Sequence, residues 1–294
     1  MRIRATVAAV SAVSGALALS AFVAPAAQAA DRPSFASTVR DTVADLRADV
    51  RADAPAARGG AAAKGAAAID VTVSGVTVNN SKDIVVGATG SYHVPITYTV
   101  NHAADLGAFG SAPVIYHGST IDTSTWGYAS DAVATCTEVS ATASKCSADF
   151  TFLPAELLNI DAGTWRVGVA VATVDEETML ENVGTRKVLR TSKVTVDAAP
   201  EPVKKGATLT VTGKLTRADW DTNKYVGYGT QSVVLQYRPA DSTAYTNVKG
   251  IKSTAAGALK TTVKASADGY YRFVFNGSPT GGKATAAGDH VDVK

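Results

Sequence analysis

The strongest constraint on the fold of this chain is a recurring pattern of short segments in which apolar and polar residues alternate. Within residues 92–100 every second side chain is apolar: Tyr92, Val94, Ile96, Tyr98 and Val100. A period of two places these side chains on one face of a strand, so the pattern predicts a half-buried β-strand. Pro95 cannot donate a backbone hydrogen bond, and we therefore expect this strand to lie at a sheet edge or to contain a bulge.

Comparable runs continue along the chain and are separated by turns, with no long helical pattern between them. They begin at Ile69, and further strands are predicted at 112–117, 130–137, 145–152, 164–174, 186–196, 207–215, 231–238, 244–249, 258–265, 269–276 and 288–293. Pro200 and Pro202 interrupt the series. We therefore predict an all-β fold of two antiparallel immunoglobulin-like β-sandwiches in tandem, over residues 68–197 and 198–294.

The two predicted domains share a local motif before their penultimate long strand. Residues 161–165 read Asp-Ala-Gly-Thr-Trp, and residues 268–271 read Asp-Gly-Tyr-Tyr. In immunoglobulin-like sandwiches an aromatic residue at this corner packs under the preceding connection. Its recurrence in both halves favours a shared architecture.

Several segments also resemble a known group of secreted proteins. VKKGATLTVTGKLTRADW, QSVVLQYRP, GALKTTVKASADGYYRF and GDHVDVK in the second half, with VTVSGVTVNNSKDIVVG and DAGTW in the first, are similar to modules in secreted tandem immunoglobulin-like proteins of high-GC Gram-positive bacteria. The resemblance implies the sandwich fold but no agreed activity. Some members of the group are labelled calcium-binding.

The N-terminal segment has the features of a secretory signal peptide. Arg2 and Arg4 precede an uncharged apolar stretch, and Ala27-Gln28-Ala29 presents small residues for cleavage after Ala29. We expect residues 1–29 to be removed, with no transmembrane segment in the mature chain. Because no C-terminal sorting motif is recognised, the product is expected outside the cell, released or held to the cell wall non-covalently.

Residues 30–67 are predicted to form an amphipathic helix followed by an Ala/Gly-rich linker. Apolar residues recur at helical spacing over 34–53: Phe35, Val39, Val43, Leu46 and Val50. This narrow stripe allows a short helix that docks loosely on the body or is marginal in solution, or instead a coiled-coil or partner-binding helix. Residues 54–67 lack periodicity and predict a flexible linker.

Cys136 and Cys146 are the two cysteines of the chain. In an exported protein they are expected to form a disulfide, and the nine Ser-, Thr- and Ala-rich residues between them predict a bridged hairpin. A structural role is favoured over a redox one, because a redox pair usually has closer spacing and a basic neighbourhood.

No catalytic signature is recognised, so we predict a protein that is not an enzyme. The sequence contains no G-x-S-x-G or H-E-x-x-H motif and no phosphate-binding glycine loop. A secreted hydrolase with an unrecognised site remains as an alternative. Without Arg2 and Arg4, 26 basic residues balance 26 acidic ones, so no overall charge favours nucleic acid as a partner.

Residues 219–223 resemble the start of a calcium-binding loop. Asp219, Asp221 and Asn223 offer oxygen ligands at alternate positions, and extracellular calcium binding is the leading alternative function. Lys224 stands where such a loop needs glycine, and Thr230 stands where it needs a bidentate acid. A solvated polar loop is therefore favoured, and no cofactor other than calcium is considered.

The same connection is rich in aromatic residues. Trp220, Tyr225 and Tyr228 either cap the end of the sandwich as satellite core or present ring faces to a sugar or a protein partner. Both interpretations stay open on sequence grounds.

Charge separates the two domains sharply. Residues 68–197 hold 7 basic and 14 acidic residues, a net of −7, whereas residues 198–294 hold 13 and 7, a net of +6. This split either holds the domains together or leaves the second domain free to bind an anionic wall polymer, a glycan or a protein. Lys260 and Lys264 share one strand face around Thr262 and are candidate ligand-binding residues. We predict a secreted binding or envelope-associated protein with the second domain as its attachment module.

Overall fold

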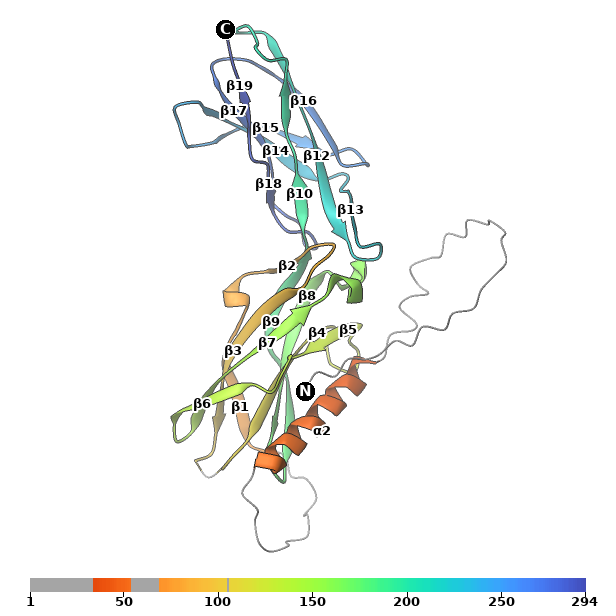
Figure 1. Cartoon of the computed structure of the whole chain (residues 1–294), viewed down its shortest axis with the longest axis vertical. Coiled ribbons are helices and arrows are strands. Elements are labelled where there is room, and N and C mark those ends of the chain that lie inside the picture. The colour runs from red at the N-terminus through yellow and green to blue at the C-terminus, as the bar shows by residue number, and fades with distance from the viewer. Residues whose placement is uncertain (1–33, 54–68, 105) are drawn as a thin grey trace, which may run out of the picture.

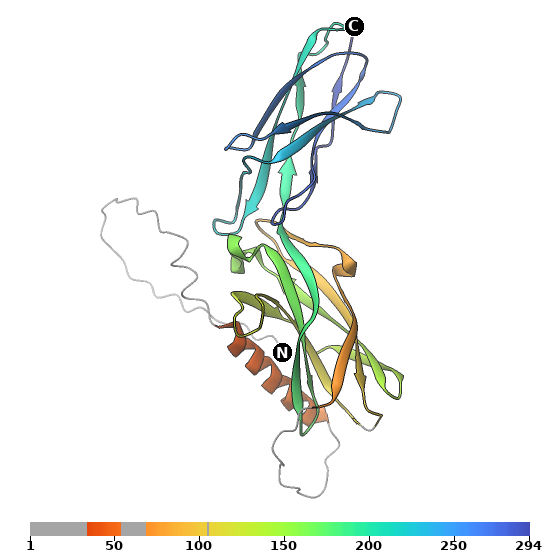
Figure 2. The same cartoon turned by 180° about the vertical axis from the view of Figure 1, so that it is seen from behind.

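The computed structural model describes residues 34–53, 69–104 and 106–294. They form two β-sandwiches that follow each other along the long axis of the molecule (Figures 1 and 2). The predicted signal peptide and the linker over 54–67 lie outside the described residues. The all-β fold of two immunoglobulin-like sandwiches in tandem is confirmed.

The first sandwich packs a four-stranded sheet against a five-stranded one. The four-stranded sheet has the order β1 (Val71–Val78), β3 (Tyr92–His102), β7 (Ala143–Phe152) and β6 (Thr135–Ser140). The other has the order β2 (Ile84–Val86), β9 (Glu177–Arg190), β8 (Gly163–Ala172), β4 (Gly110–His117) and β5 (Trp126–Ala129). Pairing is antiparallel except between β2 and β9. Alternate residues of both sheets meet in a core that includes Tyr98, Phe150, Phe152 and Trp165.

The strand containing Pro95 was predicted to lie at a sheet edge or to contain a bulge, and the edge position was wrong. A bulge is present only in the partner strand β1, between Ser74 and Thr77. Strand β3 is an inner strand, paired with both β1 and β7. The pairing with β1 ends where Val78 stands opposite Ile96, so Pro95, the next residue toward the start of β3, has no partner in β1. The missing amide hydrogen therefore removes no bond to β1, and an inner strand tolerates the proline.

The second sandwich also has two sheets, each with five strands. One contains β10 (Ser192–Val194), β11 (Asp197–Ala199), β13 (Lys224–Gly227) and β16 (Ala258–Lys264), all paired with the long strand β12 (Thr208–Asp219). The other contains β15 (Thr246–Lys252), β14 (Ser232–Pro239), β17 (Gly269–Phe275), β18 (Ala284–Thr285) and β19 (Asp289–Val291). Its core includes Leu209, Val211, Leu235 and Phe273.

The second sandwich begins earlier than the sequence predicted. Strands β10 and β11 pair with β12, and one residue, Thr191, separates β10 from β9 of the first sandwich. Residues 192–197 thus join the second domain rather than the first. Pro200 and Pro202 interrupt the chain inside that domain, between β11 and β12, and do not mark its start. Because the segment carries Lys193 and Asp197, the charge balance of the two domains is unchanged.

Helix α2 (Phe35–Asp53) adds a third layer to the first sandwich. It lies on the outer face of the five-stranded sheet, where it contacts β4, β5 and β8 (Figure 1). Phe35, Val39, Leu46 and Val50 are buried there. The expectation of loose docking was wrong for the described helix. Among the described residues, no helix is long and apolar enough to cross a membrane.

The helix packs directly against two glycines of the sheet, Gly110 and Gly127. A Cβ atom at Gly127 would lie 2.5 Å from ring atoms of Phe35, and one at Gly110 would lie 2.7 Å from Cδ1 of Leu46. These distances are shorter than any van der Waals contact. The absence of side chains at both positions is what lets the helix approach the sheet so closely.

The predicted disulfide is confirmed. Cys136 of β6 stands directly opposite Cys146 of β7, and their sulfur atoms are bonded. The bridge therefore joins two neighbouring strands of one hairpin and does not link the two sheets. At the predicted aromatic corner, the indole of Trp165 donates a hydrogen bond of 2.7 Å to the carbonyl oxygen of Asp161.

Candidate functional site

Trp220 lies at the joint between the two sandwiches, not on an open surface. Strand β12 carries the chain to the end of the second domain, and Trp220 follows it into the core of the first. Its side chain is 1% exposed, and its Nε1 donates a hydrogen bond of 2.9 Å to the carbonyl oxygen of Gly87. Of the two interpretations, an available stacking face is wrong for Trp220, because the first domain covers the ring.

The two tyrosines of the same connection are also occupied. Arg217 lies over the ring of Tyr228 at 3.8 Å, and the Tyr228 hydroxyl is 2.7 Å from Oγ of Ser278. Lys193 lies over the ring of Tyr225, with its Nζ 3.7 Å from the ring centroid. Tyr228 is buried, which rules out stacking on a ligand, whereas Tyr225 is half-buried at the edge of the joint. The alternative of satellite core fits Trp220 and Tyr228, with the difference that Trp220 serves the core of the neighbouring domain.

Two of the three candidate calcium ligands, Asp219 and Asp221, contact the first domain as well. Asn159, in the short 3-10 turn η3 (Asn159–Asp161), donates from Nδ2 to Asp219 at 2.9 Å and to Asp221 at 2.6 Å. Its backbone amide donates to the other oxygen of Asp221 at 2.9 Å. Asn223 occupies the left-handed region with φ of 54° in the turn before β13. The two acids thus hold the joint, a role that the sequence did not indicate.

Among the described residues, no group of three or more His, Cys, Asp or Glu side chains is placed to hold a metal ion. The aspartates are brought together, but their oxygens accept hydrogen bonds from Asn159. Calcium binding at Asp219, Asp221 and Asn223 stays an untested alternative to the favoured polar loop.

A buried arginine completes the joint. Arg190, at the end of β9, is 6% exposed and donates from Nη1 to Oδ1 of Asn159. The same Oδ1 accepts the backbone amide of Trp220 at 3.0 Å. Burial, together with the charge of Arg217, lowers the pKa of Arg190 to about 10, and the nearby aspartates oppose that shift. Asn159 and Arg190 were missed at the sequence level because neither belongs to a recognisable motif.

Lys260 and Lys264 occupy a different surface, far along the second sandwich from the joint. They alternate with the buried residues Leu259 and Thr261 on β16, so both side chains are exposed beside Thr262, as predicted. Across the strand pair, Lys260 faces Thr212 and Lys264 faces Thr208 of β12. Lys264 donates from Nζ to Oγ1 of Thr208 at 3.0 Å. We call Thr208, Thr210, Thr212, Lys260, Thr262 and Lys264 the lysine–threonine face.

The excess charges of the two domains do not meet at the joint. The lysines of the second domain that supply most of its charge are all exposed: Lys204, Lys205, Lys214, Lys249, Lys252, Lys260 and Lys264. The joint instead uses two acids of the basic domain and Arg190 of the acidic domain. Neither of the ion pairs between described residues crosses it.

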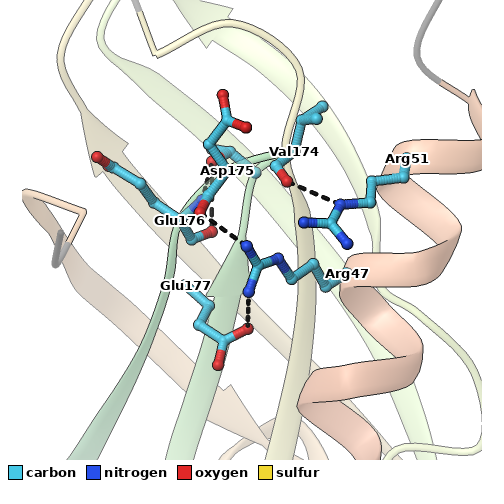
Figure 3. Close-up of polar contacts among 7 residues, drawn as sticks. Arg47, Arg51, Val174, Asp175, Glu176 and Glu177 are labelled. Atoms are coloured by element: carbon cyan, nitrogen blue, oxygen red, sulfur yellow. Dashed lines mark hydrogen bonds and ion pairs between the residues drawn. The ribbon is translucent and has the colours of Figure 1, made fainter. Parts of the chain in front are cut away.

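Arginines of helix α2 bind a turn of the first domain, at the acidic connection before β9. Arg47 donates to the carbonyl oxygen of Asp175 at 2.9 Å and pairs with Glu177 at 3.4 Å, and Arg51 donates to the carbonyl oxygen of Val174 at 3.0 Å (Figure 3). Both guanidinium groups reach from one end of the helix to the same turn. Part of the negative charge there is therefore engaged within the domain.

No family model matches the sequence, and no curated protein does. Solved structures match over most of the chain at low identity. A chimeric titin Z1Z2 tandem is 13% identical, with 72% of this chain and 95% of that chain covered and a TM-score of 0.25. The ectodomain of mouse nectin-like molecule 4 is 13% identical, with 77% and 65% covered and a TM-score of 0.24. The adhesin InvE of Yersinia pseudotuberculosis is 12% identical, with 75% and 58% covered and a TM-score of 0.25. At these TM-scores the matches carry no argument about the function of this chain.

Proposed function

We propose that this protein is a secreted, non-enzymatic binding protein that attaches to an anionic polymer of the cell envelope through its second sandwich. The observation that carries the proposal is the lysine–threonine face, where Lys260 and Lys264 stand exposed on one strand face. Four threonine hydroxyls lie beside them; that of Thr208 accepts a hydrogen bond from Lys264, and that of Thr212 donates to Asp197 at the edge of the face. Lysine binds phosphate as a point charge, and hydroxyl groups add directed hydrogen bonds.

The contacts at the joint argue against the alternative in which the opposite charges hold the two domains together. The exposed lysines of the second domain take no part in holding the two domains together, because Trp220, Asn159 and the two aspartates do that. Their positive charge therefore remains available to an external ligand. The disulfide in the first domain supports an exported protein, since such bonds persist in oxidising compartments.

The spacing of the two lysines favours a repeating anion. They are four residues apart on an extended strand, which separates their Cα atoms by about 13 Å. A flexible polymer with phosphate groups along its backbone can contact both at once. A single small anion cannot.

The test uses the full mature chain. The isolated second domain is unsuitable, because removing the first domain would expose Trp220. Purified cell walls are incubated with the protein at 50 and 300 mM NaCl, before and after hydrofluoric acid removes their phosphate polymers. We expect retention that falls steeply with salt, that needs the phosphate, and that is reduced in the Lys260→Gln/Lys264→Gln variant.

The matched control is Lys82→Gln/Lys145→Gln, which removes the same charge from exposed positions of the first domain. It should leave retention unchanged. Equal losses in the two double variants would show that only total charge matters, and the lysine–threonine face would then lose its assigned role. Retention that is indifferent to salt would overturn the proposal altogether.

A further inference from the structure

A second surface of the same domain carries a stack of arginine and tyrosine side chains. Arg238 of β14 lies over the ring of Tyr270 of β17 at 3.7 Å and 5.4 Å from the ring of Tyr245. Arg272 of β17 lies over the ring of Tyr245 at 3.6 Å. We call these four residues the arginine–tyrosine face. It lies on the β15–β14–β17 sheet, whereas the lysine–threonine face lies on the other sheet.

Strand alternation puts these side chains on the outer side of the sheet. Arg238 stands opposite Tyr270, and Arg272 stands opposite Gln236. Leu235 and Phe273, which alternate with these positions on the two strands, point into the core and are fully buried. All four members of the face remain half-buried. On the β19 side, the ring of His290 packs against that of Tyr270, with 4.9 Å between the ring centroids.

The guanidinium groups are held in place by neutral acceptors, and no carboxylate of the described residues is paired with them. Nε of Arg272 donates to Oε1 of Gln236 at 2.8 Å, and Nη1 of Arg238 donates to the carbonyl oxygen of Ser242 at 2.7 Å. Neither arginine forms an ion pair with any described acid. A planar fork that is fixed on an aromatic ring and still lacks a carboxylate is ready to accept one with two parallel hydrogen bonds.

The surroundings of the arginines indicate which kind of molecule brings that carboxylate. Sugars stack on open aromatic faces, and here guanidinium groups already cover faces of Tyr245 and Tyr270. On the same side of β14 and β17, Val234 stands opposite Val274. Val248, at the bulge of the neighbouring strand β15, is 45% exposed. Tyrosine, arginine and apolar groups on one surface are the composition of protein interfaces.

We propose that the arginine–tyrosine face is a docking surface for an acidic polypeptide segment. Carboxylates of the partner bind Arg238 and Arg272, and its apolar side chains contact the valines. Charge complementarity selects an acidic partner, and the covered ring faces select a polypeptide over a glycan. This inference is independent of the attachment function, because it concerns another face and another ligand.

The experiment measures binding of a fluorescent decaglutamate peptide to the full mature chain by anisotropy at 50 mM NaCl. A decagalacturonate of equal charge serves as the glycan probe. We expect the peptide to bind more tightly than the glycan. Arg238→Lys/Arg272→Lys keeps the charge but loses the planar forks, and should weaken peptide binding about tenfold or more. Lys260→Gln/Lys264→Gln should change it less than about twofold, although it is expected to reduce wall retention.

Arg238 also bonds the turn after β14, so a folding control is needed. The single variant Arg272→Lys leaves that bond intact and should still weaken the peptide about threefold or more, with an unchanged melting temperature. Undiminished peptide binding in both arginine variants would overturn the proposal. Glycan binding that equals or exceeds peptide binding would overturn it as well. Loss of wall retention in the lysine variant alone bears on the attachment function and leaves this inference intact.

Discussion

The indole nitrogen of Trp220 donates its hydrogen bond to the backbone of Gly87, in the other domain, at 2.9 Å. A residue of the second sandwich thereby becomes part of the hydrophobic core of the first. Asn159 donates hydrogen bonds to both Asp219 and Asp221, so the joint combines a buried apolar ring with hydrogen bonds between the domains. We therefore expect these contacts to restrict the motion of the two sandwiches relative to each other.

The first prediction concerns this joint. Replacing Trp220 with alanine removes a large buried ring and should lower the free energy of unfolding by about 3–5 kcal/mol. It should also free the domains to move, because the apolar part of the joint is lost. Urea denaturation measures the first effect. Small-angle X-ray scattering measures the second as a broader distribution of distances within the chain.

Ile160 provides the control for that experiment. It follows Asn159 at the same end of the first domain but is 59% exposed. Ile160→Ala should change stability by less than about 0.5 kcal/mol and leave the scattering curve unchanged. A Trp220→Ala variant that scatters like the natural chain would show that the polar contacts alone fix the joint.

The second prediction concerns the contact between helix α2 and Gly127 of the sheet. Gly127→Ala places a methyl group 2.5 Å from the ring of Phe35 and should destabilise the first domain by about 1–3 kcal/mol, because a packed ring cannot move aside freely. Gly250→Ala is the matched control, since nothing lies within 4 Å of a Cβ at that exposed strand position.

A compensating variant separates steric conflict from a general loss of stability. Phe35→Leu shortens the side chain that meets the new methyl group. In the double variant with Gly127→Ala, part of the lost melting temperature should return. If the loss of stability in the double variant equals the sum of the losses in the two single variants, the two residues are not coupled. The methyl group at Gly127 would then not act through the ring of Phe35.

Much of the fold followed from periodicity alone. Alternation identified the strand around Tyr98, and helical spacing identified the buried stripe from Phe35 to Val50. Periodicity could not show which element packs against each face of a strand or helix. The outer face of β4 and β8 is covered by the helix through Gly110 and Gly127, and nothing local in those glycines shows that a helix lies over them. The domain boundary was displaced for a similar reason, because strand pairing and not proline placement determines it.

The third prediction concerns calcium. Asp219 and Asp221 already accept hydrogen bonds from Asn159, and a cation would have to displace these bonds. Titration calorimetry should therefore detect no binding tighter than the millimolar range, near the weak end of extracellular calcium sites. A sub-micromolar site that disappears in Asp221→Ala would reverse this conclusion and favour the calcium-binding alternative.

The candidate site shows where sequence reasoning stops. Oxygen ligands at alternate positions and a cluster of aromatic residues were visible in residues 219–228, and both are typical of ligand sites. The same residue types also suit a domain joint, and the choice between the two depends on what lies opposite. Asn159 and Gly87 are about 60 and 130 residues away along the chain and belong to no motif. By contrast, Lys260 and Lys264 required only strand alternation, and their shared face was predicted correctly.

The fourth prediction concerns the pH dependence of stability through His117. This side chain lies at the end of β4, with Nδ1 3.0 Å from Oγ1 of Thr125 and its ring 5.9 Å from that of Trp165. Burial lowers the pKa of His117 below its ordinary value of 6.5, and the charge of Asp161 only partly offsets this. As pH falls through 6.5, His117 binds a proton in the unfolded chain while it is still neutral in the folded chain. The free energy of unfolding must therefore decrease on acidification, down to the folded-state pKa.

His117→Asn keeps a polar atom near the position of Nδ1 but cannot titrate, so it isolates this contribution. Urea unfolding at pH 8, 7, 6 and 5.5 should show that the natural chain loses more stability between pH 7 and 5.5 than the variant does. His93→Asn, at an exposed position of β3, controls for the replacement of one imidazole by an amide. Because carboxylates titrate in all three proteins, the difference between their slopes, and not the slope itself, reports on His117. A His117→Asn variant with the same or a steeper loss on acidification would mean that the folded state does not disfavour the imidazolium, and that the packing against Trp165 does not control the charge of this histidine.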